Sequence, residues 1–113
     1  MPFIHVRTNT AIPKDKEQAV KTGLGKAIST IPGKSEQWLM VNITPESALY
    51  FQGSDAPAAM VEVQVYGGAS GTAYDAMTGK ISGILTENLG IPANRIYVSY
   101  HATPDWGWNG GNF

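Results

Sequence analysis

The stretch Phe3-Ile4-His5-Val6-Arg7-Thr8 alternates apolar and polar side chains, a pattern typical of a β-strand with one buried face. A similar alternation returns at Met60-Val61-Glu62-Val63-Gln64. The turn sequence Thr44-Pro45-Glu46 is likewise echoed by Thr103-Pro104-Asp105, at nearly the same offset along the chain. The sequence is therefore predicted to contain one structural unit twice.

Within the first unit, a helix and a second strand are predicted to follow the opening strand. Apolar residues recur at helical spacing from Lys14 to Ile31, and Pro32-Gly33 then ends the predicted helix. The segment from Trp38 to Ile43 is predicted as the second strand, closed by the turn that starts at Thr44. Leu49-Tyr50-Phe51 is predicted as a short extra strand.

The second unit repeats this order. Its predicted elements are a strand from Ala59 to Val65, a helix from about Thr72 to Leu89 capped by Gly90, and a strand from Ile96 to Tyr100. Right-handed β-α-β crossovers place both helices on the same side of the sheet. The predicted fold class is α/β (α+β): a two-layer sandwich with a four-stranded sheet and two helices on one face, in a single domain over residues 1–113.

The other face of this sheet is predicted to carry apolar side chains contributed by the alternating strands. A monomer would leave that face exposed to water. We therefore expect a closed oligomer in which the sheets face inward.

Composition restricts the classes of function. The chain has 113 residues, 42% of them hydrophobic and 15% charged, with a net charge of -1, so neither a nucleic acid nor a membrane surface is an expected partner. It has no cysteine, which excludes disulfides and thiolate chemistry. With two distant histidines and no clustered carboxylates, no metal or other cofactor is expected. The chain start lacks a secretory signal, so a cytoplasmic location is the expectation.

Pro2 is the candidate catalytic residue. A small second residue generally permits removal of the initiator Met1, which would leave the secondary amine of Pro2 as the chain end. An α-amino group titrates near ~8, and an apolar pocket and a nearby cation such as Lys34 would both lower its pKa. The strand that starts at Phe3 would hold Pro2 rigidly, so the amine is predicted to act as a neutral base.

Other residues have two interpretations at this stage. Lys34 follows Pro32-Gly33 and is either an anion anchor or a solvated loop residue. The aromatic residues near the C-terminus are more typical of a core or an interface than of a pocket. The glycine-rich turn from Tyr66 to Gly71 lacks the Gly-Lys-Ser/Thr ending of a phosphate-binding loop, so it is a weak candidate for a phosphate site.

Five segments together resemble the macrophage migration inhibitory factor family of the tautomerase superfamily, and the similarity runs essentially from end to end. The resemblance implies a homotrimer that catalyses keto-enol tautomerisation of phenylpyruvate and related aromatic α-keto acids. The segments are Met1-Pro2-Phe3-Ile4, Gly33-Lys34, Phe51-Gln52-Gly53-Ser54, Arg95-Ile96-Tyr97-Val98 and Trp106-Gly107-Trp108-Asn109.

The resemblance also implies a role for each candidate. Pro2 would transfer the proton, while Lys34 and the backbone amide of Tyr66 would hold the substrate carboxylate. Tyr97, reaching in from the neighbouring subunit with Ser99 beside it, would help stabilise the enolate oxygen. The walls of the pocket for the aromatic ring would be Trp38, Trp106, Trp108 and Phe113.

Some positions depart from the animal members of the family. This chain has Val65-Tyr66-Gly67 where a serine-isoleucine-glycine turn is usual, and Ser99 where an asparagine is usual. These changes are expected to alter substrate preference, with Tyr66 narrowing the pocket. The segment from Ala58 to Val61 takes the place of a Cys-x-x-Cys motif, so thiol oxidoreductase activity is expected to be absent.

Two alternatives stay open from the sequence. One is a cytokine-like protein that binds a cell-surface receptor, leaves the cell without a signal peptide and keeps only a vestigial pocket. The other is a decarboxylase or dehalogenase of the same superfamily, in which Pro2 acts as an acid. That chemistry requires a further arginine or carboxylate, for which Arg7, Arg95 and Asp105 are the candidates.

Overall fold

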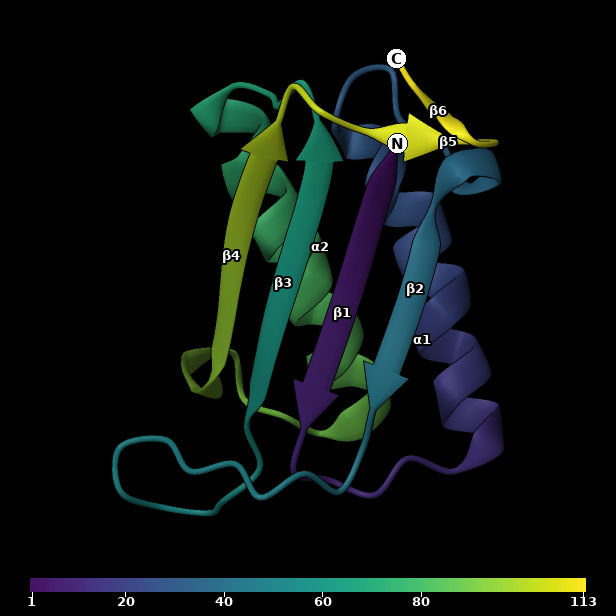
Figure 1. Cartoon of the computed structure of the whole chain (residues 1–113). Coiled ribbons are helices and arrows are strands. Elements are labelled where there is room, and N and C mark those ends of the chain that lie inside the picture. Colours follow the sequence, from purple (N-terminus) through teal and green to yellow (C-terminus); the bar gives the residue numbers. More distant parts are fainter.

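The computed structural model describes all 113 residues and contains one four-stranded sheet with the order β2-β1-β3-β4. Strand β1 runs parallel to β2 and antiparallel to β3, and β3 runs parallel to β4. Both helices cover the same face of the sheet, as Figure 1 shows. The strands are β1 (Pro2–Thr8), β2 (Met40–Thr44), β3 (Ala59–Tyr66) and β4 (Ile96–Thr103), and the helices are α1 (Lys14–Ala27) and α2 (Gly71–Leu89). The predicted two-layer fold is confirmed.

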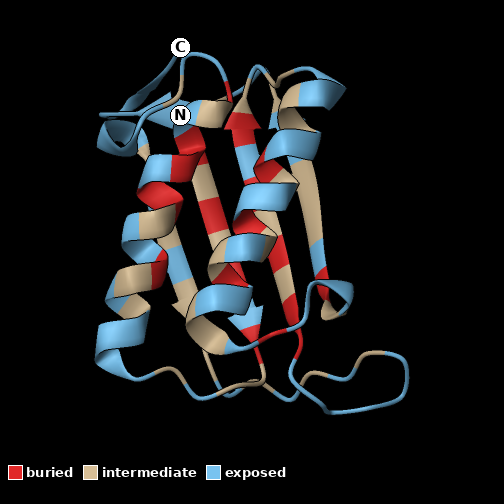
Figure 2. Cartoon of the chain, turned by 180° about the vertical axis from the view of Figure 1, so that it is seen from behind, coloured by how far each residue is buried: buried red, intermediate tan, exposed pale blue.

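The core lies between the helices and the sheet. Alternate residues of β1 and β3, including Ile4 and Val63, are fully buried there, as the period-two pattern predicts. Leu24 of α1 and Ile81 and Leu85 of α2 close the core from the other side. Figure 2 shows the buried residues gathered between the two layers. Each such side chain contributes about 1.5–3 kcal/mol on burial.

The ends of the two helices differ slightly from the predicted ones. Helix α1 stops at Ala27 and continues as a short 3-10 turn, η1 (Ile28–Thr30), so the predicted helix boundary at Ile31 is too late by one turn. Helix α2 starts with a cap in which the Ser70 hydroxyl accepts from the Ala73 amide at 3.1 Å. It ends at Gly90, whose φ of 69° is left-handed.

Two predicted strands are wrong in part. Trp38 belongs to a 3-10 turn, η2 (Glu36–Trp38), and β2 begins only at Met40. The segment Leu49-Tyr50-Phe51 forms no strand; its only bridge joins Phe51 to Ser54. The side chains of Asn9 and Arg95 hydrogen-bond to the carbonyls of Leu49 and Phe51 instead of a neighbouring strand. Figure 1 shows the loop extending beyond the end of the sheet opposite to the two termini.

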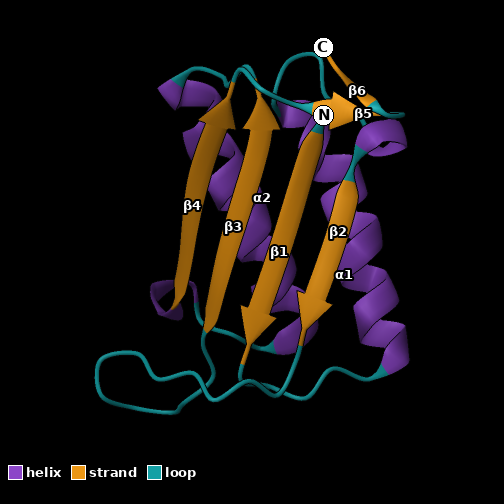
Figure 3. Ribbon diagram, in the orientation of Figure 1, coloured by secondary structure: helices purple, strands orange, loops and turns teal.

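The C-terminal tail forms a hairpin that the sequence analysis did not predict. Strands β5 (Gly107–Trp108) and β6 (Gly111–Asn112) pair antiparallel. The turn between them is Asn109-Gly110, with φ values of 54° and 86°. Such an Asn-Gly pair is a strong hairpin signal. Figure 3 places this hairpin next to the N-terminus.

The open face of the sheet is polar at its centre, which corrects the prediction of an apolar face. His5 shares a 2.9 Å hydrogen bond with Thr44 there, and Ser99 shares a 3.1 Å hydrogen bond with His101. Apolar side chains gather only toward the ends of this face: Phe3 beside Met40 at one end, Met60 beside Tyr97 at the other. No helix has the length and apolarity needed to span a bilayer.

Candidate functional site

The chain start is held firmly in the sheet. Pro2 is the first residue of β1, is buried, and pairs with Val65 of β3. The carbonyl of Met1 accepts a 3.0 Å hydrogen bond from the backbone amide of Tyr66. The N-terminus is therefore an ordered part of the molecule, as the strand starting at Phe3 predicts.

A groove of about 350 Å³ opens at this end of the sheet. Most of the side chains around it are apolar. The lining residues are Met1, Pro2, Phe3, Gln37, Trp38, Leu39, Met40, Trp106, Gly107 and Trp108. Gln37, Leu39 and Met40 were missed in the sequence analysis, although the exposed alternate positions of β2 are a signal for Met40.

The terminal amine has an unusual electrostatic environment. The pKa of the Met1 amine is lowered from 8.0 to about 6, first by burial, then by the positive charge of Lys34 and a hydrogen bond from its side chain. All three causes penalise the ammonium form of the Met1 amine. The neutral form of the Met1 amine is therefore favoured over the ammonium form at neutral pH.

Lys34 reaches the site because of the turn that ends the first helical segment. Gly33 adopts a φ of 80°, and the Lys34 amide donates to the carbonyl of Ile31 at 3.1 Å. The Lys34 Nζ then donates to the carbonyl of Tyr66 at 2.9 Å and lies 5.8 Å from the centre of the Tyr66 ring. The Lys34 side chain is thus held against Tyr66, although it is not among the residues that line the groove.

Aromatic side chains form the outer wall of the groove. Trp38 and Trp108 pack edge to face with ring centres 5.1 Å apart. Phe113 does not line the groove; it packs on the Tyr66 ring at 5.5 Å, and its amide donates to the carbonyl of Trp106. Trp38, Trp108 and Phe113 remain 41%, 53% and 56% exposed, which is unusual for large apolar side chains and indicates a binding surface.

Tyr97 and Ser99 lie elsewhere in the same chain. Tyr97 pairs with Met60, which faces Arg7 near the end of β1, whereas Pro2 stands at the start of β1. The Tyr97 ring packs on Phe51, with centres 4.7 Å apart. One chain therefore brings together Pro2, Lys34, Tyr66 and the predicted aromatic walls, but neither Tyr97 nor Ser99.

Comparison with known proteins identifies the family. The family model described as Macrophage migration inhibitory factor (MIF) matches residues 1–113. The chain is 30% identical to macrophage migration inhibitory factor of Xenopus laevis, covering 100% of this chain and 99% of that protein. It is 31% identical to the macrophage migration inhibitory factor homolog of Trichuris trichiura, covering 100% of both. The chain belongs to the macrophage migration inhibitory factor family.

Solved structures of family members have the same fold. The structure of Leishmania major MIF2 superposes with a TM-score of 0.93 at 35% sequence identity, covering 100% of this chain and 97% of that one. A macrophage migration inhibitory factor homologue from Prochlorococcus marinus gives a TM-score of 0.89 at 28% identity, covering 98% of both chains. The resemblance read from the sequence motifs is confirmed.

The candidates for decarboxylase or dehalogenase chemistry do not line the groove of this family member. The Arg95 guanidinium donates only to backbone carbonyls of the loop between β2 and β3. Arg7 is exposed on the open face of the sheet. Asp105 takes part in backbone hydrogen bonds with the hydroxyl of Thr103. Within one chain, none of the three lines the groove beside Pro2.

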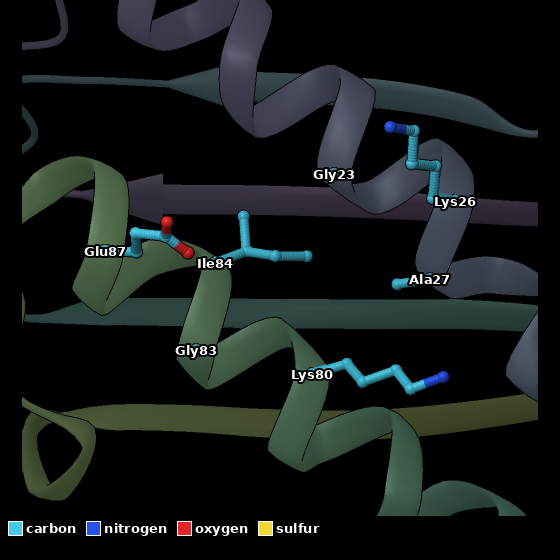
Figure 4. Close-up of a pocket in the computed structure, with 7 residues that line it drawn as sticks. All are labelled: Gly23, Lys26, Ala27, Lys80, Gly83, Ile84 and Glu87. Atoms are coloured by element: carbon cyan, nitrogen blue, oxygen red, sulfur yellow. The ribbon is translucent and has the colours of Figure 1, made fainter.

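A second hollow, of about 380 Å³, lies on the helical layer between α1 and α2. Figure 4 shows Ile84 between the two helices, with charged side chains around the hollow. The lining residues are Gly23, Lys26, Ala27, Lys80, Gly83, Ile84 and Glu87. This hollow contains no aromatic side chain, so its similar size does not make it the better candidate for an aromatic ligand. No group of three or more potential ligands lies close enough together to hold a metal ion.

Proposed function

We propose that this family member is a keto-enol tautomerase for phenylpyruvate-like aromatic α-keto acids, and that Pro2 becomes its general base once Met1 is removed. The observation that carries the proposal is the position of Met1. The Met1 carbonyl accepts a hydrogen bond from the Tyr66 amide, and the positive charge of Lys34 lowers the pKa of the Met1 amine. Met1 thus contacts both the Tyr66 amide and the Lys34 ammonium, the two groups that we assign to binding the substrate carboxylate.

Removal of Met1 has two consequences at once. It makes the Pro2 nitrogen the terminal amine, subject to the same burial and the same cation that lower the pKa of the Met1 amine. It also frees the Tyr66 amide beside the Lys34 ammonium. An N–H donor next to a cation is suited to a carboxylate.

The groove supplies the rest of a site for an aromatic keto acid. A carboxylate between Lys34 and the Tyr66 amide would leave the aromatic ring of the substrate against the apolar wall that includes Trp38 and Trp108. The neutral Pro2 nitrogen would take a proton from the carbon next to the keto group, and the electron pair of that C–H bond would move to the keto oxygen as an enolate. Protonation of the enolate oxygen then gives the enol. In the reverse direction the enol loses its O–H proton, and protonated Pro2 delivers a proton to the carbon to give the keto form.

A second copy of the chain would stabilise the enolate. Tyr97, with Ser99 beside it, would reach the oxygen from the neighbouring subunit of a homotrimer. The apolar ends of the open face support this arrangement, because Phe3 and Met40 border the groove while Met60 and Tyr97 lie at the opposite end. Such ends are suited to meet each other in a closed ring.

The test compares two forms of the same chain. Protein whose Met1 is removed, verified by intact mass, should interconvert the keto and enol forms of phenylpyruvate and hydroxyphenylpyruvate. Protein that keeps Met1, made with methionine aminopeptidase inhibited, should lose at least about 100-fold in kcat/KM, the usual contribution of a general base. Equal turnover by both forms would refute the role of Pro2.

The receptor-binding alternative is supported by the names of the relatives, which describe factors acting on macrophage migration. The exposed aromatic side chains around the groove are also suited to a protein partner. Saturable binding to host cells by protein that turns over none of a panel of aromatic keto acids would favour this alternative over the enzyme.

A further inference from the structure

Arg95 makes a concentrated set of contacts far from the groove. It ends the 3-10 turn η3 (Ala93–Arg95), directly before β4. Its guanidinium donates to four backbone carbonyls of the loop that joins β2 to β3. The acceptors are Pro57 at 2.9 Å and Phe51, Ser54 and Ala56 at 3.1 Å each. All four hydrogen-bond acceptors are thus backbone carbonyls of this loop, and none is a carboxylate.

The chemistry of the guanidinium explains why an arginine is suited to this task. It is planar, always charged and carries five N–H donors in a fixed fork. Four of these donors are used here, in charge-assisted hydrogen bonds. A lysine ammonium on a flexible stem cannot reach the same set of acceptors. The arginine therefore fixes the path of the loop from Phe51 to Pro57.

The contacts continue from Arg95 to Tyr97 through one aromatic ring. The guanidinium carbon lies 5.2 Å from the centre of the Phe51 ring. The Phe51 ring packs on Tyr97 at 4.7 Å with an interplanar angle of 55°. Tyr97 is 61% exposed, and Phe51 has the one aromatic ring that packs on it, while Tyr50 and Met60 border the same apolar hollow. The Phe51 ring, which the loop holds in place, is thus a direct packing partner of the Tyr97 ring.

Asn9 holds the same loop by a separate set of hydrogen bonds. Its side-chain amide donates to the carbonyls of Leu49, Asp55 and Ala56 and accepts from the amide of Ala58, at 2.9–3.0 Å. The loop therefore keeps an anchor when Arg95 is changed. This separates the effect of Arg95 on Phe51 from loss of the whole loop.

We infer that Arg95 is a positioning residue, which orients Tyr97 through Phe51 for the site of a neighbouring copy of the chain. The inference rests on the proposed function, in which Tyr97 completes that site. Arg95 touches neither substrate nor base; it acts at the far end of its own sheet and in the site of another subunit.

The first test measures whether Arg95 and Tyr97 act as one unit. Arg95→Lys should lower kcat by about tenfold with little change in KM, because the interaction with the enolate is made in the transition state. Tyr97→Ala should lower it at least as much, and the double variant should lose no more than Tyr97→Ala alone. Phe51→Leu, which leaves Arg95 intact, should resemble Arg95→Lys. Unchanged turnover in Arg95→Lys, or losses that multiply in the double variant, would overturn the inference.

The second test asks whether Arg95 acts across subunits. Arg95→Lys chains keep Pro2, and Pro2→Gly chains keep Arg95, so mixed trimers contain sites with Pro2 from one chain and a held Tyr97 from the other. Co-expressed and separated by tags, the mixed trimers should exceed the average activity of the two pure variants. Activity at or below that average would mean that Arg95 acts only within its own subunit, and the inference would be wrong.

A readout without turnover separates this inference from the proposed function. Wild-type protein with no tautomerase activity, or Pro2→Gly protein as active as wild type, would refute the proposed function. Amide hydrogen exchange tests whether Arg95 stabilises the loop between β2 and β3, whether or not the protein is a tautomerase. Exchange from Phe51 to Ala58 should be faster in Arg95→Lys than in wild type and equal to wild type in the control Lys80→Gln. Equal exchange in Arg95→Lys and wild type would contradict the hold itself.

Discussion

Strand β1 begins at Pro2 with only Met1 before it, whereas its counterpart in the second unit, β3, begins at Ala59 after a long loop. The residues that end the 3-10 turns before the second strands differ in the same way. Trp38 ends η2 and forms the wall of the groove, while Arg95 ends η3 and holds that loop. One repeated unit thus presents an amine beside an aromatic groove at one end of the sheet, and a braced tyrosine at the other.

The repeated fold alone therefore does not place an amine beside an aromatic groove. Both units bury the same kind of alternating strand under a helix. Only the first has a chain end at the start of its strand, and only there does an amine meet a cation, Lys34. In the proposed trimer, the end of the sheet with Pro2 and Lys34 would meet the Tyr97 end of a neighbouring copy. The first end would supply the amine, and the second end would supply the tyrosine.

The largest expected effect comes from removing the base. Pro2→Gly should lower kcat/KM for phenylpyruvate by about 100-fold or more, because general base catalysis contributes that much. The variant keeps a small second residue, so Met1 removal must be verified by intact mass. A ketonisation assay on the enol measures the loss. Turnover within a factor of a few of wild type would show that the proline is dispensable.

Removing the cation should have the next largest effect. Lys34→Ala should raise KM by about 10- to 100-fold, since a hydrogen bond to a charged group contributes about 1.5–3 kcal/mol. Lys26→Ala, on the helical layer, is the matched control and should leave KM unchanged. Steady-state kinetics of both variants test the assignment, which fails if the two variants behave alike.

The aromatic wall should contribute less. Trp38→Ala removes the edge-to-face contact with Trp108 and should raise KM about tenfold, the effect of losing an aromatic contact and part of its buried area. Trp38→Phe, which keeps a ring, should recover most of the affinity. A KM that depends on neither change would mean that the substrate ring binds elsewhere.

The smallest effect concerns the helices of the two units. Helix α2 has the Ser70 side-chain cap, whereas α1 follows Pro13 without one. Ser70→Ala should lower the free energy of unfolding by about 1 kcal/mol. Thr72→Ala at the same helix end is the control and should lower it by less. Urea unfolding at one protein concentration measures both, and equal losses would contradict the capping role.

The fold could be predicted because its signals are local. The alternation in β1 and β3, the helical spacing and the cap at Gly90 each act within a few residues. The Asn109-Gly110 turn was an equally local signal, and the hairpin was predictable from it. The loop before β3 was not, because Asn9 and Arg95 hold it from distant parts of the chain.

The residues that surround the groove were predictable only in part, and their contacts were not. The motifs pointed to Pro2 and Lys34, yet the hydrogen bond between Lys34 and the Tyr66 carbonyl depends on how two separate turns pack. The polar centre of the open face was not predicted. Alternation shows which side chains share a face of the sheet, but it does not show that this face is apolar. His5 and Ser99 on this face are polar and form side-chain hydrogen bonds.

The pH dependence of kcat/KM in protein free of Met1 shows whether the neutral amine of Pro2 is the base. A base acts only when it is neutral, so activity should be low in acid and rise to a plateau with increasing pH. Burial and Lys34 lower the pKa of an amine at this place, so the rise should have an apparent pKa below the ordinary value of 8.0, and Lys34→Ala should move it upward. A rise at or above 8.0, or activity that is flat from about pH 5 to about pH 9, would contradict a neutral Pro2 base.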